Sequence, residues 1–196
     1  MRLGQERDWL VGYQDETWWS REAQPRLRTW ATLGRPQRLV EHHVPATDPS
    51  PKALACYGLW LPTVAETWLR FVDGRPISAL TTQYLDWCLV QAAARGQTTL
   101  LLVWDQASWH LSKEVTRWIR GHNQTVQRTG QGVRLIPCRL PSKSPWLNLI
   151  EPKWRQGKRQ VVEPERLLSL DEVEARVCAA FRCPRYQHLV IPNNVS

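Results

Sequence analysis

The chain has 196 residues, of which 42% are hydrophobic and 22% are charged, a composition typical of one globular domain. Its 12 Trp residues need a buried interior, which excludes a largely disordered chain, and no apolar run approaches the roughly 18 residues of a membrane span. The net charge is +8, and a basic chain attracts polyanions, of which nucleic acid is the commonest.

The N-terminal half is predicted to contain three strands and then a helix. Residues 9–14 form a short apolar and aromatic run that ends at Asp15. Residues 38–44 and 53–61 follow as two more strands, and their connections are too short for crossover helices, which favours antiparallel pairing. Residues 81–94 carry apolar side chains at helical spacing, and Gly96 can end this helix.

The C-terminal half alternates strands and helices. Residues 98–104 are continuously apolar, as in a central strand buried on both faces, and they end at Asp105. An amphipathic helix is predicted over 111–123, a short strand over 133–138, and a loop over 139–147. A helix over 148–160 follows, with Asn148 and Glu151 spaced as a capping box, and a last helix spans 170–181.

This order predicts an α/β fold with a mixed five-stranded sheet and helices on both faces. Residues 184–196 are expected to be a loosely held tail. The start of the chain shows no secretory signal, and the five Cys residues form no C-x-x-C pattern, so we expect free thiols and a cytoplasmic location, with no contact with membranes.

The positive charge is concentrated in one part of the chain. Residues 113–159 hold eleven basic residues against two acids, Glu114 and Glu151, a net charge of +9. Such a local positive field favours nucleic acid as a partner, although a solvated basic face without a partner has the same composition.

Three carboxylates lie at the ends of predicted elements. Asp15 and Asp105 each end a strand, and Glu151 begins a basic helix. In α/β sheets, sites form at the carboxyl ends of strands, so Asp15 and Asp105 meet if their strands are neighbours, and Glu151 can supply a third ligand. Hard oxygen ligands suit Mg²⁺ or Mn²⁺, and two such ions about 4 Å apart can promote phosphodiester cleavage. Each acid also has a purely structural interpretation, as a turn residue or a helix cap.

At these acids the sequence resembles the DDE transposases of the IS630/Tc1/mariner group. Residues 14–17 (QDET) resemble the first acidic motif, and residues 104–110 (WDQASWH) the second. Residues 141–151 (PSKSPWLNLIE), followed by Trp154 and Lys158, resemble the third, and Trp30 with Gly34 matches a segment that follows the first motif. The likeness runs from about residue 9 to residue 183.

The resemblance implies an RNase H-like fold over residues 1–183 and a metal-binding catalytic triad of Asp15, Asp105 and Glu151. Two Mg²⁺ or Mn²⁺ ions are the implied cofactors. The implied reaction is cutting of DNA at transposon ends and joining of the freed 3′-hydroxyl to target DNA, carried out in the bacterial cytosol or nucleoid by a possible homodimer on DNA.

Four features depart from the family pattern. Gln106 stands where Asn is usual, and Leu149 replaces a common Pro while Pro152 follows Glu151. The step of 46 residues from Asp105 to Glu151 is longer than is typical, which indicates an insertion around 123–132. Only a few residues precede the first strand, so an N-terminal helix-turn-helix region is expected to be absent, as in a fragment or a decayed copy.

Other side chains could assist the triad. His110 could orient the metal site from behind a ligand or play a structural role, and Glu16 is expected to point away from Asp15 on the strand. Trp18, Trp19, Trp109 and Trp146 lie near the acidic motifs, where each could contact DNA bases or belong to the core. The predicted phosphate contacts are the basic residues that flank Glu151: Lys143, Lys153, Arg155, Lys158 and Arg159.

Two alternatives to a DNA strand transferase stay open from the sequence. One is an RNase H-like nuclease that hydrolyses nucleic acid without strand transfer. The other is a catalytically inactive remnant that keeps only the basic DNA-binding face.

Overall fold

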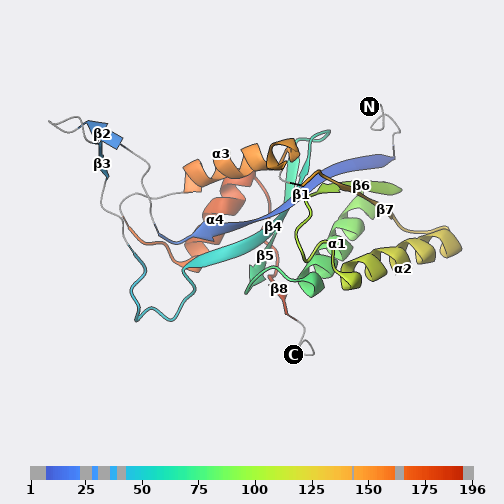
Figure 1. The fold of residues 1–196 in the computed structure, drawn as a ribbon, viewed down its shortest axis with the longest axis horizontal. Coiled ribbons are helices and arrows are strands. Elements are labelled where there is room, and N and C mark those ends of the chain that lie inside the picture. Colours follow the sequence, from blue (N-terminus) through green and yellow to red (C-terminus); the bar gives the residue numbers. More distant parts are fainter. Residues whose placement is uncertain are drawn as a thin grey trace.

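The structure is a computed structural model that describes residues 8–22, 28–30, 36–38, 43–142, 144–161 and 166–191. Figure 1 shows the order of its elements along the chain. They are β1 (Trp9–Ser20), β2 (Arg28–Trp30), β3 (Pro36–Arg38), β4 (Ala53–Leu61), β5 (Glu66–Asp73), α1 (Ser78–Ala93), β6 (Thr99–Trp104), α2 (Lys113–Thr129), β7 (Arg134–Arg139), the 3-10 helix η1 (Pro145–Leu147), α3 (Glu151–Val161), α4 (Leu170–Phe181) and β8 (Leu189–Val190).

A six-stranded mixed sheet has the strand order β7-β6-β1-β4-β5-β8, so the first strand lies in its interior. β1 pairs with β6 in parallel and with β4 antiparallel, and β6 pairs in parallel with β7. β2 and β3 pair with each other in a separate two-stranded sheet. The parallel pairing of β1 and β6 brings two segments about 90 residues apart side by side, as the expected meeting of Asp15 and Asp105 requires.

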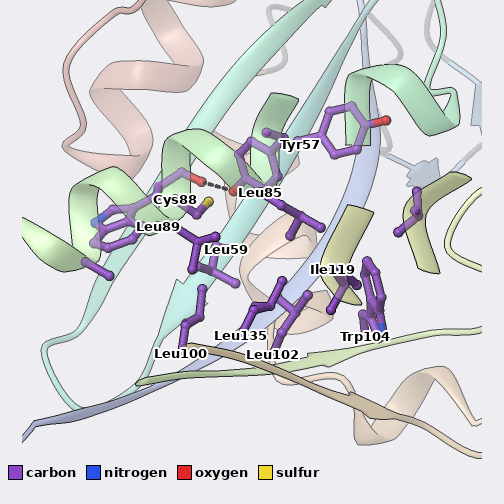
Figure 2. Close-up of a cluster of buried hydrophobic side chains, with 14 of the residues drawn as sticks. Tyr57, Leu59, Leu85, Cys88, Leu89, Leu100, Leu102, Trp104, Ile119 and Leu135 are labelled. Carbon is purple, nitrogen blue, oxygen red and sulfur yellow. Dashed lines mark hydrogen bonds between the residues drawn. The ribbon is translucent and has the colours of Figure 1, made fainter. Parts of the chain in front are cut away.

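Two hydrophobic clusters cover the two faces of the sheet, because successive strand side chains point to opposite sides. One cluster lies between the sheet and helices α1 and α2; Figure 2 shows Leu59, Leu100 and Leu102 meeting Leu85 and Ile119 there. The other cluster joins the sheet to α3 and α4, which lie together on the opposite side in Figure 1.

Local sequence explains where several elements begin and end. β6 is buried along its whole length, as its continuous apolar run predicts. Ser112 accepts a hydrogen bond from the Val115 N–H at the start of α2, and Gly130, with φ of 67°, ends that helix. α4 begins with a reciprocal capping box between Ser169 and Glu172.

The structure corrects the N-terminal part of the prediction. β1 continues through the polar residues 14–17 to Ser20, because these residues pair with β4. β5 was missed, and with it the antiparallel hairpin that β4 and β5 form. Of the strand predicted over 38–44, residue 38 ends β3, residues 39–42 lie outside the described residues, and residues 43–44 are not in a strand.

The C-terminal half follows the prediction more closely. α2 runs on to Thr129, so most of the region in which an insertion was expected is helix. The predicted tail contributes β8, which pairs with β5 and buries Leu189, while residues 192–196 lie outside the described residues. The five Cys residues are free thiols. None of the helices in the described ranges has the length and apolar character needed to cross a bilayer.

Candidate functional site

Asp15 in β1 and Asp105 directly after β6 occupy equivalent positions relative to the pairing of these parallel strands. Tyr13 of β1 is in register with Val103 of β6, and each aspartate lies two residues beyond its member of this pair. Side chains two residues apart share a face, and neighbouring strands are about 4.8 Å apart. The strand pairing therefore brings both aspartates to the same part of the sheet, and Asp15 faces α3 there.

Asp15 is held by a tryptophan of α3. Its Oδ2 accepts a hydrogen bond of 3.0 Å from the indole Nε1 of Trp154, whose side chain is buried. The indole lies directly over Gly58, the β4 partner of Asp15: a Cβ added at Gly58 would be 2.6 Å from Trp154 Cζ2 and 3.0 Å from Ile150 Cδ1. The absence of a side chain at Gly58 lets α3 approach the strand that carries Asp15.

Glu151, the first residue of α3, faces the same region. Burial, with repulsion from Glu16 and then Glu151, raises the pKa of Asp15 to about 7. Asn148 was expected to cap α3, but its side chain instead donates a 2.9 Å hydrogen bond to the Gln14 carbonyl, and its buried Oδ1 has no hydrogen-bond partner among the residues that the structure describes. The expected capping box is therefore wrong: Asn148 attaches the start of α3 to β1, next to Asp15.

Asp105 is held from the other side of the sheet. Its Oδ1 accepts a 2.9 Å hydrogen bond from the Ala107 N–H and lies 2.8 Å from His110 Nδ1. His110 Nε2 lies 2.9 Å from Glu16 Oε1, and the imidazole stacks on Trp104 with 4.5 Å between ring centroids. Burial lowers the pKa of His110, but its hydrogen bonds to Asp105 and Glu16 outweigh this and raise the pKa to about 9. The hydrogen bond from His110 also lowers the pKa of Asp105.

A cleft of about 320 Å³ opens beside Asp105. The loop that follows β6 lines it together with Leu140, Pro141, Ser142, Ser144 and Pro145. Gln106 Nε2 joins the two sides by a 2.8 Å hydrogen bond to the Leu140 carbonyl. Three exposed apolar side chains follow in the chain: Trp146, which is 73% exposed, Leu147 and Leu149. The half-exposed carboxylate of Asp105 is thus open to a molecule in this cleft.

The carboxylates of the candidate site suit a divalent cation, although they do not form a closed metal-binding site. Within the described ranges, no three His, Cys, Asp or Glu side chains are grouped closely enough to hold a metal ion. Asp15, Asp105 and Glu151 nevertheless offer hard oxygen ligands, and a divalent cation would offset the repulsion that raises the pKa of Asp15. The chemistry of the residues therefore fits Mg²⁺ or Mn²⁺.

Most of the predicted phosphate contacts lie on α3. Arg155, Lys158 and Arg159 are exposed, whereas Lys153 lies over the Trp60 ring with its Nζ 4.0 Å from the ring centroid. Lys143 lies outside the described residues. α3 therefore presents exposed positive charge on the face that carries Asp15 and Glu151.

The four tryptophans near the acidic motifs differ in their surroundings. Trp19 is buried in the core, and Trp109 donates a 3.3 Å hydrogen bond to Glu16 Oε2. Trp18 is 46% exposed, and Trp146 is the more exposed of the two at 73%. Sequence reasoning missed the contacts of Glu16 and Trp154, since both join residues more than 90 positions apart.

Comparisons with known proteins agree with this architecture. The family model described as DDE superfamily endonuclease matches residues 11–174. Among solved structures, the Mos1 transposase paired-end complex with left transposon end aligns with a TM-score of 0.63 at 16% identity, over 89% of this chain and 48% of that one. The Mos1 mariner paired-end complex with Mn gives 0.61 at 16% identity, with the same coverages.

A simian T-cell lymphotropic virus intasome in complex with PP2A regulatory subunit B56 gamma aligns with a TM-score of 0.51 at 9% identity, over 87% of this chain and 47% of that one. The chain thus spans about half the length of the structures it matches. Among curated proteins, none matches it in sequence. The structural likeness confirms the expected RNase H-like fold, with six strands in the main sheet instead of five.

Proposed function

Because the chain belongs to the DDE superfamily endonucleases, we propose that it is a transposase catalytic domain that cuts DNA and joins the freed 3′-hydroxyl to target DNA. One observation carries the proposal: Asp15 in β1 and Asp105 directly after β6 each lie two residues beyond an in-register pair of neighbouring parallel strands, and Glu151 begins the helix that packs over Asp15. Two carboxylates from adjacent strands and a third from a covering helix form the triad that we assign as catalytic.

The three carboxylates would hold two Mg²⁺ or Mn²⁺ ions, which when bound activate the attacking oxygen and stabilise the leaving oxygen of the phosphodiester. Asp15 would contribute to holding both ions, because its strand pairs with β6, which Asp105 follows, and α3, which Glu151 begins, contacts Asp15 through Trp154. Trp154 fixes one oxygen of Asp15, and His110 fixes one oxygen of Asp105. These contacts hold the ligands in place before the substrate arrives.

DNA is the proposed substrate and partner, both as transposon end and as target. The exposed cations of α3, Arg155, Lys158 and Arg159, lie on the face of the triad, where they can contact phosphates on either side of the scissile bond. We extend the same role to Lys143 and Lys153. A homodimer on DNA belongs to the proposal, as does an intracellular location in bacteria.

Asp105→Asn tests the catalytic assignment. Asn keeps the size of the side chain but removes the negative charge that a divalent ion needs, so nicking of a supercoiled plasmid with Mg²⁺ or Mn²⁺ is expected to fall below detection. Chelation of the metal should have the same effect on the wild type. Asp86→Asn is the matched control, because Asp86 is exposed on α1.

The DNA products of the reaction distinguish a strand transferase from a nuclease and from an inactive remnant. Joined strands in a gel assay with a labelled transposon end support strand transfer, whereas cleavage without joining indicates a nuclease only. DNA binding without any metal-dependent cleavage in the wild type would indicate an inactive remnant. Nicking that persists in Asp105→Asn would refute the triad.

A further inference from the structure

We propose that Glu16 is a positioning residue that fixes the orientation of Asp105 through His110. The inference rests on the proposed function, since it concerns how one carboxylate of the triad is held. Glu16 is the residue next to Asp15, but it lies on the opposite face of β1. Adjacent residues of one strand would therefore serve the same metal site from the two faces of the sheet.

Glu16 is fixed by hydrogen bonds at both carboxylate oxygens. Gln14 Nε2 donates to Oε1 at 2.8 Å, and Trp109 Nε1 donates to Oε2 at 3.3 Å. The side chain is only 7% exposed, so water does not compete freely with these donors. A buried carboxylate with these partners has a single orientation, in which Oε1 also lies 2.9 Å from His110 Nε2.

His110 links Glu16 to Asp105 through its two ring nitrogens. Its side chain is fully buried, with one ring nitrogen 2.9 Å from Glu16 and the other 2.8 Å from Asp105. An ionised carboxylate only accepts hydrogen bonds, so both ring nitrogens donate. Stacking on Trp104, with an interplanar angle of 18°, prevents the ring from tilting. The imidazole can therefore not rotate away from Asp105 without breaking its hydrogen bond to Glu16.

The two carboxylate oxygens of Asp105 therefore have different surroundings. Oδ1 takes the contacts with His110 and the Ala107 N–H, and within the described residues Oδ2 takes none. The side chain is half exposed and borders the cleft. Oδ2 is therefore the oxygen available to a metal ion, and the Glu16–His110 pair determines where it lies.

The test is a double-mutant cycle read out as Mn²⁺ affinity by calorimetry. Glu16→Gln turns one acceptor oxygen into a donor, so it disrupts the hydrogen bonds of Glu16 while keeping its size. His110→Gln removes the imidazole. Each variant is expected to bind Mn²⁺ roughly 10-fold more weakly or worse, as is typical when the supporting partner of a metal ligand is removed. The double variant should bind no more weakly than the weaker single variant.

Asp86→Asn controls for the loss of one negative charge and is expected to bind Mn²⁺ as the wild type does. If Glu16→Gln does not fold, Glu16→Asp keeps the charge but is one methylene too short for His110, and the same weakening is expected. Unchanged Mn²⁺ affinity in a folded Glu16 variant would overturn the inference, and so would effects that simply add in the double variant.

Different results would refute the proposed function and the inference about Glu16. If the wild type binds Mn²⁺ and nicks DNA while the Glu16 variants bind Mn²⁺ equally well, only the inference about Glu16 is wrong. If the wild type neither binds Mn²⁺ nor nicks DNA, the proposed function is wrong, and the inference about Glu16 falls with it.

Discussion

Trp154 connects packing and chemistry within a single side chain. Its ring belongs to the cluster between the sheet and α3, where it meets Trp19 and Phe181 edge to face at 6.0 and 5.5 Å between centroids. Its indole N–H donates to Asp15. The same residue therefore sets the position of the helix that carries Glu151 and the position of the first carboxylate.

Trp154→Phe separates these two roles. Phe keeps an aromatic ring in the cluster but cannot donate to Asp15, so both Mn²⁺ affinity and the rate of nicking are expected to fall. We expect the free energy of unfolding to fall by about 1–3 kcal/mol, because a hydrogen bond to a charged group is removed and the ring is smaller. Chemical denaturation measures the stability, and a plasmid assay measures the nicking. Nicking at the wild-type rate would show that Asp15 does not need this donor.

The individual acids of the candidate site could be predicted from the sequence, whereas their supports could not. Asp105 follows a continuous apolar run, so its place at a strand end was predictable from local sequence. The contacts of Glu16 with His110 and of Asp15 with Trp154 depend on β1 lying beside β6 and beneath α3. Long-range pairing of this kind leaves no local pattern in a single sequence.

At the level of elements, the approach of α3 to the sheet depends on a glycine in β4. Gly58 lies opposite Asp15 in the strand pairing, beneath Trp154 and Ile150. Gly157 of α3 also lies where no side chain fits. An added Cβ there would be 3.0 Å from Trp19 Cη2 and 2.5 Å from Phe181 Cε2. Both positions must stay without a side chain for helix and strand to pack this closely.

Gly58→Ala is therefore expected to push α3 outward. Overpacking of this kind costs about 1–3 kcal/mol, and moving Trp154 and Glu151 should also weaken Mn²⁺ binding. Gly121→Ala is the matched control, because Gly121 lies in α2 with nothing within 4 Å of an added Cβ. Replacing a helical Gly by Ala stabilises by about 0.5–1 kcal/mol, so thermal unfolding of the two variants should shift in opposite directions. A Gly58→Ala protein as stable as the wild type would contradict this account.

The elements that the sequence missed share a physical cause. β1 continues past Gln14 through polar residues because its neighbour β4 supplies hydrogen bonds, which override weak local propensity. β5 contains Thr67, Trp68 and Phe71, which favour strands, but charged residues at 66, 70 and 73 mask the run. Helices α1, α2 and α4 carry their own periodicity or caps, and for this reason their positions were predicted well.

At the scale of the whole molecule, exposed positive charge lies on both helical layers. α3 carries Arg155, Lys158 and Arg159 on the face of the triad, and α2 carries three exposed arginines on the opposite face. Charge alone attracts DNA to either face. Only cations near the triad are expected to contact the phosphates of a bound substrate.

Replacing the three α3 cations together by Gln should weaken DNA binding and reduce the slope of log affinity against log salt by about 0.9 for each phosphate that the protein no longer neutralises. The matched control is the triple variant Arg117→Gln, Arg120→Gln and Arg128→Gln on α2, which removes the same charge from the other face. We expect its slope to stay near that of the wild type in a fluorescence anisotropy titration. Equal changes in both triple variants would show that DNA does not select the face of the triad.

The position of β1 inside the sheet has a consequence for synthesis of the protein. β1 is made before its parallel neighbour β6, which follows about 90 residues later, and α3 is made later still. A growing polypeptide on the ribosome therefore cannot assemble the proposed triad until α3 has emerged, even though Asp15 is translated long before Glu151. Under the proposed assignment, premature termination before residue 151 would yield a product that lacks the third carboxylate, so partial translation products are expected to leave the DNA of the cell uncut.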